Sequence, residues 1–235
     1  MRITFISDIH GDPIWKEVVK KNSDMFIFLG DYFDSFTISK EDQVENFKEL
    51  IYFGENNREK STFLLGNHDI HYLLWHTEFF NSMRGSGFNE SIIHEVNNLY
   101  REHSSLFKIA YQKGKILATH AGLRQDYYDN ELKVIHKRYK EYNYADFLNM
   151  LWILKSGKLM RIGMMRGGMD RWGGVFWCDK NELLQSPLKG MTQVVGHSPI
   201  MEIEDIKVDE DTRLVFTDCM IYNKEKLNIF EIEVE

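Results

Sequence analysis

The 235-residue chain has only two cysteines, Cys178 and Cys219, and only three prolines. Two cysteines so far apart in sequence argue against a disulfide framework and against a thiolate metal site. No apolar run approaches the roughly 20 residues that a transmembrane helix needs. The first residues lack a charged segment followed by a long apolar one, so we expect no signal peptide. These absences favour a cytoplasmic protein without a membrane partner.

The chain also lacks an excess of positive charge. Its formal net charge is −7, which argues against a broad surface that grips nucleic-acid phosphates, although a local basic groove remains compatible with it. Hydrophobic residues make up 43% of the chain, which is enough for a sizeable core and excludes a disordered protein. The length fits one large domain or an unequal pair.

The first third of the chain alternates apolar and amphipathic segments. The apolar runs at 2–7, 24–30 and 61–66 predict strands, and the middle one is apolar enough to be covered on both faces. Helices are predicted between them, at 11–22 with Asp12 as N-cap and Pro13 at the first position, and at 39–57 with Ser39 as cap.

The pattern then becomes mainly helical and returns to strands near the end. Helical spacing covers 71–83, 90–107 and 144–157, with one strand between them at 113–123. The C-terminal part predicts strands at four places: 173–178, 192–198, 213–218 and 226–234. We therefore expect a single α/β domain over residues 1–235, with a helical, cap-like insertion at roughly 71–165.

Polar clusters follow five of the apolar strands directly. They are Asp8 and His10 in "DIHG", Asp31 and Asp34 in "GDYFD", Asn67, His68 and Asp69 in "GNHD", His120 in "THAGL", and His197 in "GHS". Ligands of open α/β sheets bind beyond the carboxyl ends of the strands, so all five clusters are expected to meet in one crevice. Carboxylate, amide and imidazole donors without thiolates suit divalent metals such as manganese, iron or zinc.

Each cluster alone is a weak signal. An Asp-x-His pair is seldom a metal site, a lone histidine after a strand is more often a satisfied polar residue, and glycine followed by Asp or Asn commonly marks a plain turn. To exclude a site, however, all five clusters would have to be ordinary turns or satisfied polar residues, each at the end of an apolar strand. Several carboxylates in one crevice would also repel one another without cations.

These five motifs, in this order and at these separations, resemble the calcineurin-like metallophosphoesterases. Within that family the chain looks most like the phosphoprotein phosphatase branch, which includes small bacterial and phage serine/threonine phosphatases and symmetrical diadenosine tetraphosphatases. The motifs span residues 8–198, and the C-terminal segment resembles the closing strands of the tetraphosphatase group more weakly. The resemblance implies a four-layer α/β/β/α sandwich and a phosphorylated substrate, either a protein or a small molecule.

The resemblance also implies the role of each motif residue. Asp8 and His10 would bind one metal ion, Asp31 would bridge two, and the second ion would be completed by Asn67, His120 and His197. His68 would be the general acid for the leaving group, oriented by Asp34. The two ions, manganese, iron or zinc, would activate a bound hydroxide for direct hydrolysis without a phosphoenzyme.

Two departures from the family pattern limit this transfer. Phosphatases of this branch usually have an arginine directly after the "GDxxD" element, where this chain has Ser35, which cannot replace a bidentate clamp on phosphate. Candidate substitutes are Arg166, Arg171 and Arg124, each of which could equally be a surface charge. Secondly, the aromatic-rich insertion could stack on a nucleobase, although core packing is the more probable role.

The sequence also leaves alternatives to phosphatase activity. A dinucleoside polyphosphate hydrolase remains open, and a phosphodiesterase or nuclease is less favoured because Ser198 follows His197 where such enzymes often have a second histidine. A non-catalytic scaffold would be expected to lose ligands or the acid, and here all are present. The remaining histidines are interpreted as surface or packing residues, and His71, three positions after His68, is the one that most needs checking.

Overall fold

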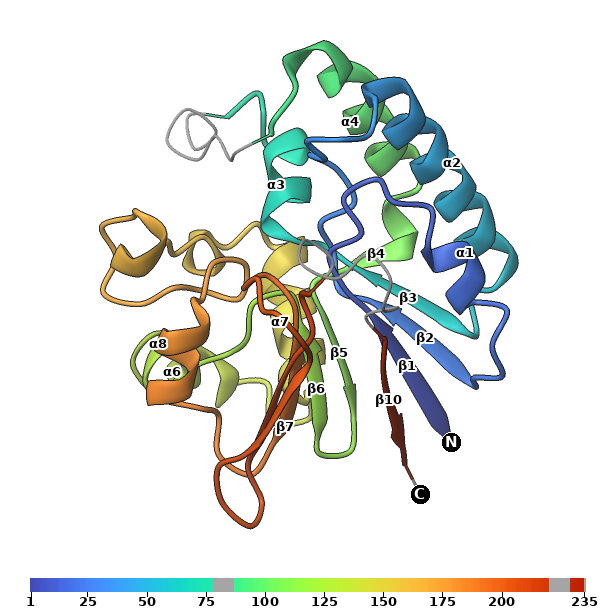
Figure 1. Ribbon diagram of the computed structural model, residues 1–235. Coiled ribbons are helices and arrows are strands. Elements are labelled where there is room, and N and C mark those ends of the chain that lie inside the picture. Colours follow the sequence, from blue (N-terminus) through green and yellow to red (C-terminus); the bar gives the residue numbers. More distant parts are fainter. Residues whose placement is uncertain (78–86, 220–228, 235) are drawn as a thin grey trace. The chain divides into compact units, whose positions relative to one another are not determined.

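The computed structural model describes residues 1–77, 87–219 and 229–234 (Figure 1). It confirms the α/β class, with two five-stranded sheets and helices. The chain forms two compact units, which we describe separately: Met1–Lys108 with the C-terminal strand, and Ile109–Asn228. None of the described helices combines the length and apolar character that crossing a bilayer requires.

The sheet of the first unit is parallel except at one edge. Its strand order is β10-β1-β2-β3-β4, and only β10 runs antiparallel to its neighbour. The bounds are β1 (Arg2–Ile6), β2 (Met25–Phe28), β3 (Ser61–Leu64), β4 (Phe107–Lys108) and β10 (Ile229–Glu233). Strands β1, β2 and β3 are buried on both faces, which explains their nearly continuous apolar sequences. Their carboxyl ends share one edge of the sheet.

The helices of the first unit follow the predicted order. They are α1 (Trp15–Val18), α2 (Lys40–Asn56), α3 (Asn67–Leu73), η2 (Glu90–Ile92), α4 (Ile93–Glu102) and η3 (Ser104–Leu106). Ser39 caps α2 as predicted, by accepting a hydrogen bond from the Asp42 amide. The first helix is shorter than predicted. Asp12 accepts from the amide of Ile14, only two residues on, and forms a turn there, so α1 starts later.

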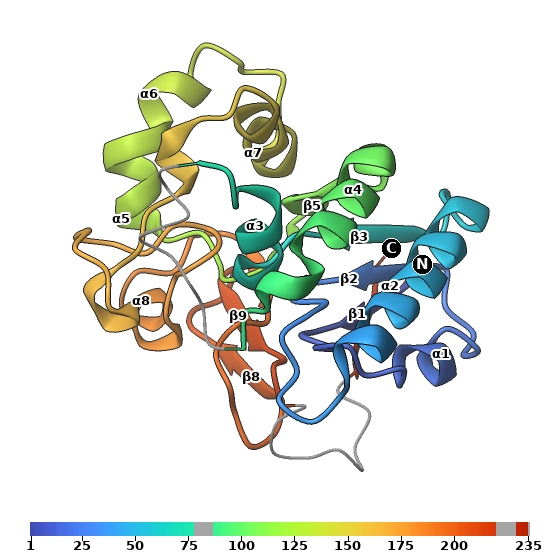
Figure 2. The same ribbon diagram turned by 90° about the horizontal axis from the view of Figure 1, so that it is seen from above.

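An aromatic core joins the helices of this unit to its sheet. Figure 2 shows α2 and α4 next to one another, and they are linked by Phe47, whose ring centroid lies 4.8 Å from that of Tyr100. Phe28 and Phe63, on neighbouring strands, stack at 4.6 Å. These four aromatic side chains therefore serve packing, and Tyr100 is the one among them that belongs to the aromatic-rich insertion.

The sheet of the second unit has three parallel strands between antiparallel edges. Its order is β5-β6-β7-β9-β8, and the bounds are β5 (Ala110–Lys113), β6 (Ile116–Thr119), β7 (Thr192–Val195), β8 (Glu204–Lys207) and β9 (Arg213–Phe216). The predicted strand at 173–178 is wrong. The amides of Trp177 and Cys178 both bond to the Gly174 carbonyl, which closes a tight turn instead. Strand β8, rich in charge at an exposed edge, was not predicted.

Short helices fill the connection between β6 and β7. They are α5 (Gln125–Tyr127), the π-helical turn η4 (Tyr128–Leu132), α6 (Lys133–His136), α7 (Tyr144–Ile153), η5 (Gly157–Leu159), η6 (Met164–Arg166) and α8 (Lys180–Gln185). Helix α7 is tied to the edge strand β5 because the Asn149 side chain bonds to the backbone of Ile109 and Ala110. The cap-like insertion at 71–165 stays a prediction. Part of it, residues 78–86, lies outside the described residues, as does the start of the predicted strand at 226–234.

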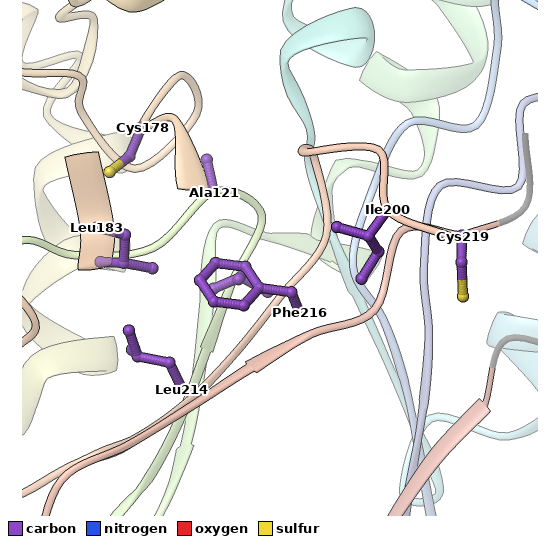
Figure 3. Close-up of a cluster of buried hydrophobic side chains, with 8 residues drawn as sticks. Ala121, Cys178, Leu183, Ile200, Leu214, Phe216 and Cys219 are labelled. Carbon is purple, nitrogen blue, oxygen red and sulfur yellow. The ribbon is translucent and has the colours of Figure 1, made fainter. Parts of the chain in front are cut away.

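Both cysteines lie in the apolar core of the second unit (Figure 3). The side chains of Cys178 and Cys219 are both almost fully buried. Burial raises the pKa of Cys178 well above its usual range.

Candidate functional site

Unusual backbone conformations coincide with the predicted site residues. Six non-glycine residues among those described have a positive φ, and five of them are predicted site residues: Asp8, His10, Asp31, Asp34 and His197. Such a conformation costs roughly 1–3 kcal/mol each and persists only where surrounding contacts impose it. Each of these residues follows a strand, so the strain falls where the chain turns sharply out of the sheet.

Glycine makes the turn after β2 possible. Gly30 has a φ of 99°, and a Cβ placed on it would lie 2.3 Å from the Gly66 nitrogen. The chain segments that leave β2 and β3 therefore approach too closely for any side chain at this position. This contact brings the "GDYFD" and "GNHD" motifs together within the first unit.

Asp8, His10 and Asp31 form the first group of candidate metal ligands. Each offers one ligand atom, and these atoms lie within 4.8 Å of one another. His10 Nδ1 lies 2.5 Å from the Phe33 carbonyl oxygen, which fixes the proton on Nδ1 and leaves the Nε2 lone pair for a ligand. Burial lowers the pKa of His10, although the Asp31 carboxylate raises it, so the neutral ring that a metal needs is favoured. The donor types and their spacing fit a divalent cation.

Asp69 is a fully buried hub behind this group. Its Oδ2 accepts from the amides of Asp31 at 2.8 Å and Gly66 at 2.7 Å, and its Oδ1 accepts from the Tyr32 amide at 3.0 Å and the Tyr100 hydroxyl at 2.7 Å. Burial and the nearby Asp31 carboxylate raise the pKa of Asp69, and the hydrogen bonds from Gly66, Tyr100 and Tyr32 lower it by less. The net result is a pKa of about 7. The sequence left the role of Asp69 open. The structure shows that it ties the turn after β2 to the start of α3.

His68 and Asp34 are held together at the start of α3. His68 Nδ1 lies 2.7 Å from Asp34 Oδ2, and the His68 amide donates to Asp31 Oδ1 at 2.9 Å. Burial lowers the pKa of His68, but the carboxylates of Asp31 and Asp34 raise it more, to about 9. The hydroxyl of Tyr72 donates to the second oxygen of Asp34. Asp34 is thus fixed from both sides by residues one turn apart on α3.

Tyr72 was missed as a site residue in the sequence. It stood inside a helical run of aromatics, where core packing is the default interpretation, and it is indeed fully buried. Its spacing of four residues from His68 on one helix was the available signal, because such residues share a helix face. Asn67, the remaining predicted ligand of this unit, is the first residue of α3 and is 8% exposed.

Ser35 uses its side chain within its own turn. Its hydroxyl oxygen accepts from the amides of Thr37 and Ile38, at 3.3 and 3.2 Å. Its amide donates to the Gln43 side chain. The position that carries an arginine in many phosphatases therefore stabilises the loop before α2 and offers no charge.

The second unit contributes a histidine pair. His120 follows β6 and His197 follows the adjacent parallel strand β7, so both lie at the same edge of the sheet. His120 Nε2 and His197 Nδ1 are 3.2 Å apart, and both side chains are buried. Two imidazole nitrogens at this separation can share one cation, because ligands about 2.0–2.1 Å from a tetrahedral metal lie a little over 3 Å apart.

The three candidate arginines differ in how exposed their guanidinium groups are and in how many of their donors are already bound. Arg166 bonds to Ser198 Oγ at 2.6 Å and pairs with Asp179 at 3.0 Å, so it also supports the loop of His197. Arg171 is exposed and lies over the Trp172 ring at 4.8 Å. Arg124 is only 5% exposed and is bound to both oxygens of Asp126.

Arg124 also donates to the carbonyl of Glu182. With its guanidinium bound on two sides and buried, it is the least available of the three for an incoming anion. Burial lowers the pKa of Arg124, but the hydrogen bond and the charge of Asp126 raise it more, so it stays charged.

Comparisons with known proteins bear on this geometry. A family model described as calcineurin-like phosphoesterase matches residues 1–201. Curated proteins give no match. Among solved structures, the chain is similar to the cold-active protein-tyrosine phosphatase of a psychrophile, Shewanella sp., with 15% identity and a TM-score of 0.57, over 99% of this chain and 75% of that one.

The chain is also similar to a protein serine/threonine phosphatase from Saccharomyces cerevisiae that is described as similar to human phosphatase PP5. The identity is 14% and the TM-score 0.53, over 100% of this chain and 81% of that one. At such identities the likeness shows the fold, which agrees with the predicted metallophosphoesterase class. The family match covers well over half of the sequence. The chain therefore belongs to the calcineurin-like phosphoesterases, and it is a phosphoric ester hydrolase.

Proposed function

We propose that the chain is a metal-dependent phosphatase that hydrolyses phosphomonoesters, on a protein or on a small molecule, with a centre of two metal ions. The observation that carries the proposal is a buried Asp34–His68 pair beside three metal-ligand side chains at one sheet edge. An acid next to a cation site is what phosphoester cleavage needs. The leaving oxygen must receive a proton while the charge on the phosphoryl group is neutralised.

The ligand assignment is part of this proposal. Asp8 and His10 would hold one ion, and Asp31 would contact both. Asn67, His120 and His197 would complete the second ion. When bound, such a pair of cations would supply an activated water and would neutralise phosphoryl oxygens.

His68 would donate the proton to the leaving group. Its Nδ1 is engaged by Asp34, so the proton available to substrate is the one on Nε2, which lies 4.0 Å from Asp31 Oδ2. The Asp34 side chain is fully buried, whereas the His68 side chain is 15% exposed. Asp34 would fix the ring orientation and stabilise its protonated form, and His68 is the member of the pair with accessible side-chain surface.

We propose Arg171 and Arg166 as the phosphate-binding arginines in place of the missing one at Ser35. Arg171 is exposed and has an aromatic ring as its described neighbour, which leaves its donors for an anion. The Arg166 guanidinium is partly engaged by Ser198 and Asp179, so it would offer phosphate its remaining N–H donors while it also holds the His197 loop. Arg124 stays a weaker candidate.

The two similar phosphatases bear on the substrate. One is described as a protein-tyrosine phosphatase and the other as a protein serine/threonine phosphatase, so phosphorylated protein is the first class to test. A dinucleoside polyphosphate is the alternative, because a charged surface arginine serves a polyphosphate equally well. A phosphodiester is a further alternative.

The function is tested with chelator-stripped protein assayed with and without added Mn²⁺. The substrates are phosphoserine and phosphotyrosine peptides, diadenosine tetraphosphate and a bis-aryl phosphodiester. We expect manganese-dependent release of phosphate from at least one monoester. Activity on the tetraphosphate alone would move the assignment to that class. Absence of bound metal, measured by elemental analysis after dialysis against Mn²⁺, would refute the proposal.

Replacing Tyr72 with phenylalanine should slow turnover of alkyl monoesters about tenfold. The change removes one hydrogen bond to the Asp34 carboxylate, and bonds to charged groups contribute roughly 1.5–3 kcal/mol, of which only part affects the acid. The expected loss is in kcat rather than KM, and it should nearly vanish with an aryl phosphate, whose leaving group needs little protonation. Equal losses on both substrates would show a structural role only.

A further inference from the structure

His71 is a buried histidine that the proposed reaction does not use. It lies on α3, three residues after His68, so the two side chains share a helix face. Their ring centroids are 5.8 Å apart, and His71 is 1% exposed. One ligand atom each from Asp34, His68 and His71 lie within 4.8 Å of one another. All three residues belong to the first unit.

We propose that Asp34, His68 and His71 form a further cation site that binds Zn²⁺ and inhibits the enzyme by occupying its general acid. The inference rests on the proposed function, because it assigns inhibition to the pair that would protonate the leaving group. The site shares no residue with the group of Asp8, His10 and Asp31, although it lies next to that group.

The donor set selects zinc over manganese. Two imidazole nitrogens and one carboxylate oxygen are a common set of three protein ligands for zinc, with a fourth position left for water or substrate. Manganese stands at the weak end of the order of divalent-metal affinities and prefers oxygen donors. It should therefore fill the more oxygen-rich group at Asp8 and Asp31 and leave the two histidines of α3 to zinc.

The surroundings of Asp34 support a metal ligand at this position. Tyr72 donates a hydrogen bond to Asp34 Oδ1, whereas Asp34 Oδ2 faces His68 Nδ1 at 2.7 Å. A ligating carboxylate is typically oriented by such an outer hydrogen bond. The ion would enter past the His68 ring, the most exposed of the three side chains, with 15% of its side-chain surface accessible.

Zinc binding would remove the acid without removing any catalytic cation. The proton that His68 and Asp34 share would leave to solvent, and the freed nitrogen lone pair and carboxylate oxygen would coordinate zinc instead. His68 would then be a neutral, zinc-bound ring, and the proton left on its Nε2 would be a far weaker acid than a proton of the charged imidazolium. Turnover of alkyl phosphates, which depends on the acid, should therefore be inhibited more strongly than turnover of aryl phosphates.

The test is a zinc titration of the manganese-loaded enzyme with an alkyl phosphate. We expect inhibition of the unmodified protein, and at least about a tenfold higher zinc concentration for half-inhibition in His71→Gln, since even outer-shell losses cost 10–100-fold in metal affinity. His71→Phe should behave likewise while keeping a ring against Phe88, its neighbour at 6.0 Å. His94→Gln, on the neighbouring helix α4, is the matched control and should change nothing.

A second readout separates this inference from the proposed function. Zinc bound per chain, measured by equilibrium dialysis of the manganese-loaded proteins, should fall by one in both His71 variants and stay unchanged in the control. The same loss of zinc in a protein without phosphatase activity would refute the function and keep the site. Unaltered zinc binding and inhibition in either folded His71 variant would overturn the site, whatever the activity.

Discussion

Changing His68 to asparagine is expected to lower kcat for an alkyl monoester by about 10²–10⁴-fold, the usual contribution of a positioned acid. Asparagine cannot give a proton to a departing alkoxide, so the leaving group would have to leave as the unprotonated alkoxide, which is a poor leaving group. An aryl phosphate should lose far less activity, because its leaving group is stable without a proton. The comparison of both substrates by steady-state kinetics measures the acid role directly.

Two controls accompany this variant. Asp34→Asn should show the same dependence on the leaving group, since Asp34 acts through its bond to His68. Manganese content should be unchanged in His68→Asn, because His68 is not in the proposed ligand set. Full retention of alkyl phosphatase activity in His68→Asn would remove the residue from the mechanism and leave the metal assignment standing.

The grouping of the first candidate ligands at one sheet edge was predictable because strands are easy to recognise. Continuous apolar runs predicted β1, β2 and β3, and parallel strands of one sheet bring the residues that follow them to one edge. The grouping of Asp8, His10 and Asp31 follows from that rule alone. The strand predicted at 173–178 from its apolar sequence was wrong, because two glycines and local hydrogen bonds make this segment a turn.

The supporting residues could not be predicted, because tertiary contacts define them. Asp69 is bonded to amides 37 and 38 residues earlier and to a tyrosine 31 residues later. Neither spacing leaves a pattern in the sequence. The arginines show the same limit, because the sequence does not reveal which of Arg124, Arg166 and Arg171 is buried or already hydrogen-bonded. Only the structure separates one that is bound on two sides from one that is exposed.

Replacing Asp69 with asparagine should destabilise the fold and weaken manganese binding together. Asparagine keeps the shape but has one acceptor oxygen, so two of the four donors lose their partner. An unsatisfied buried donor costs roughly 1–3 kcal/mol, and the free energy of unfolding should therefore fall by about 2–6 kcal/mol. The Asp31 amide is one of the four donors, and its bond is lost if it faces the new NH2 group and weakened if it faces the uncharged amide oxygen. Since Asp31 has a φ of 57°, loss of that bond should also let this proposed ligand leave its strained position.

Denaturant unfolding and manganese calorimetry measure the two effects, and Tyr100→Phe distinguishes them. That control removes one donor to Asp69 Oδ1 and leaves the bond from Asp31 to Oδ2 in place. We expect Tyr100→Phe to lose stability, by about 1.5–3 kcal/mol for a bond to a charged group, and to keep its manganese affinity. In Asp69→Asn the affinity should fall about 10–100-fold, as for loss of an outer-shell partner. If both variants bind manganese like the unmodified protein, Asp69 stabilises the first unit without positioning Asp31, and the strain at Asp31 must be maintained by its other contacts.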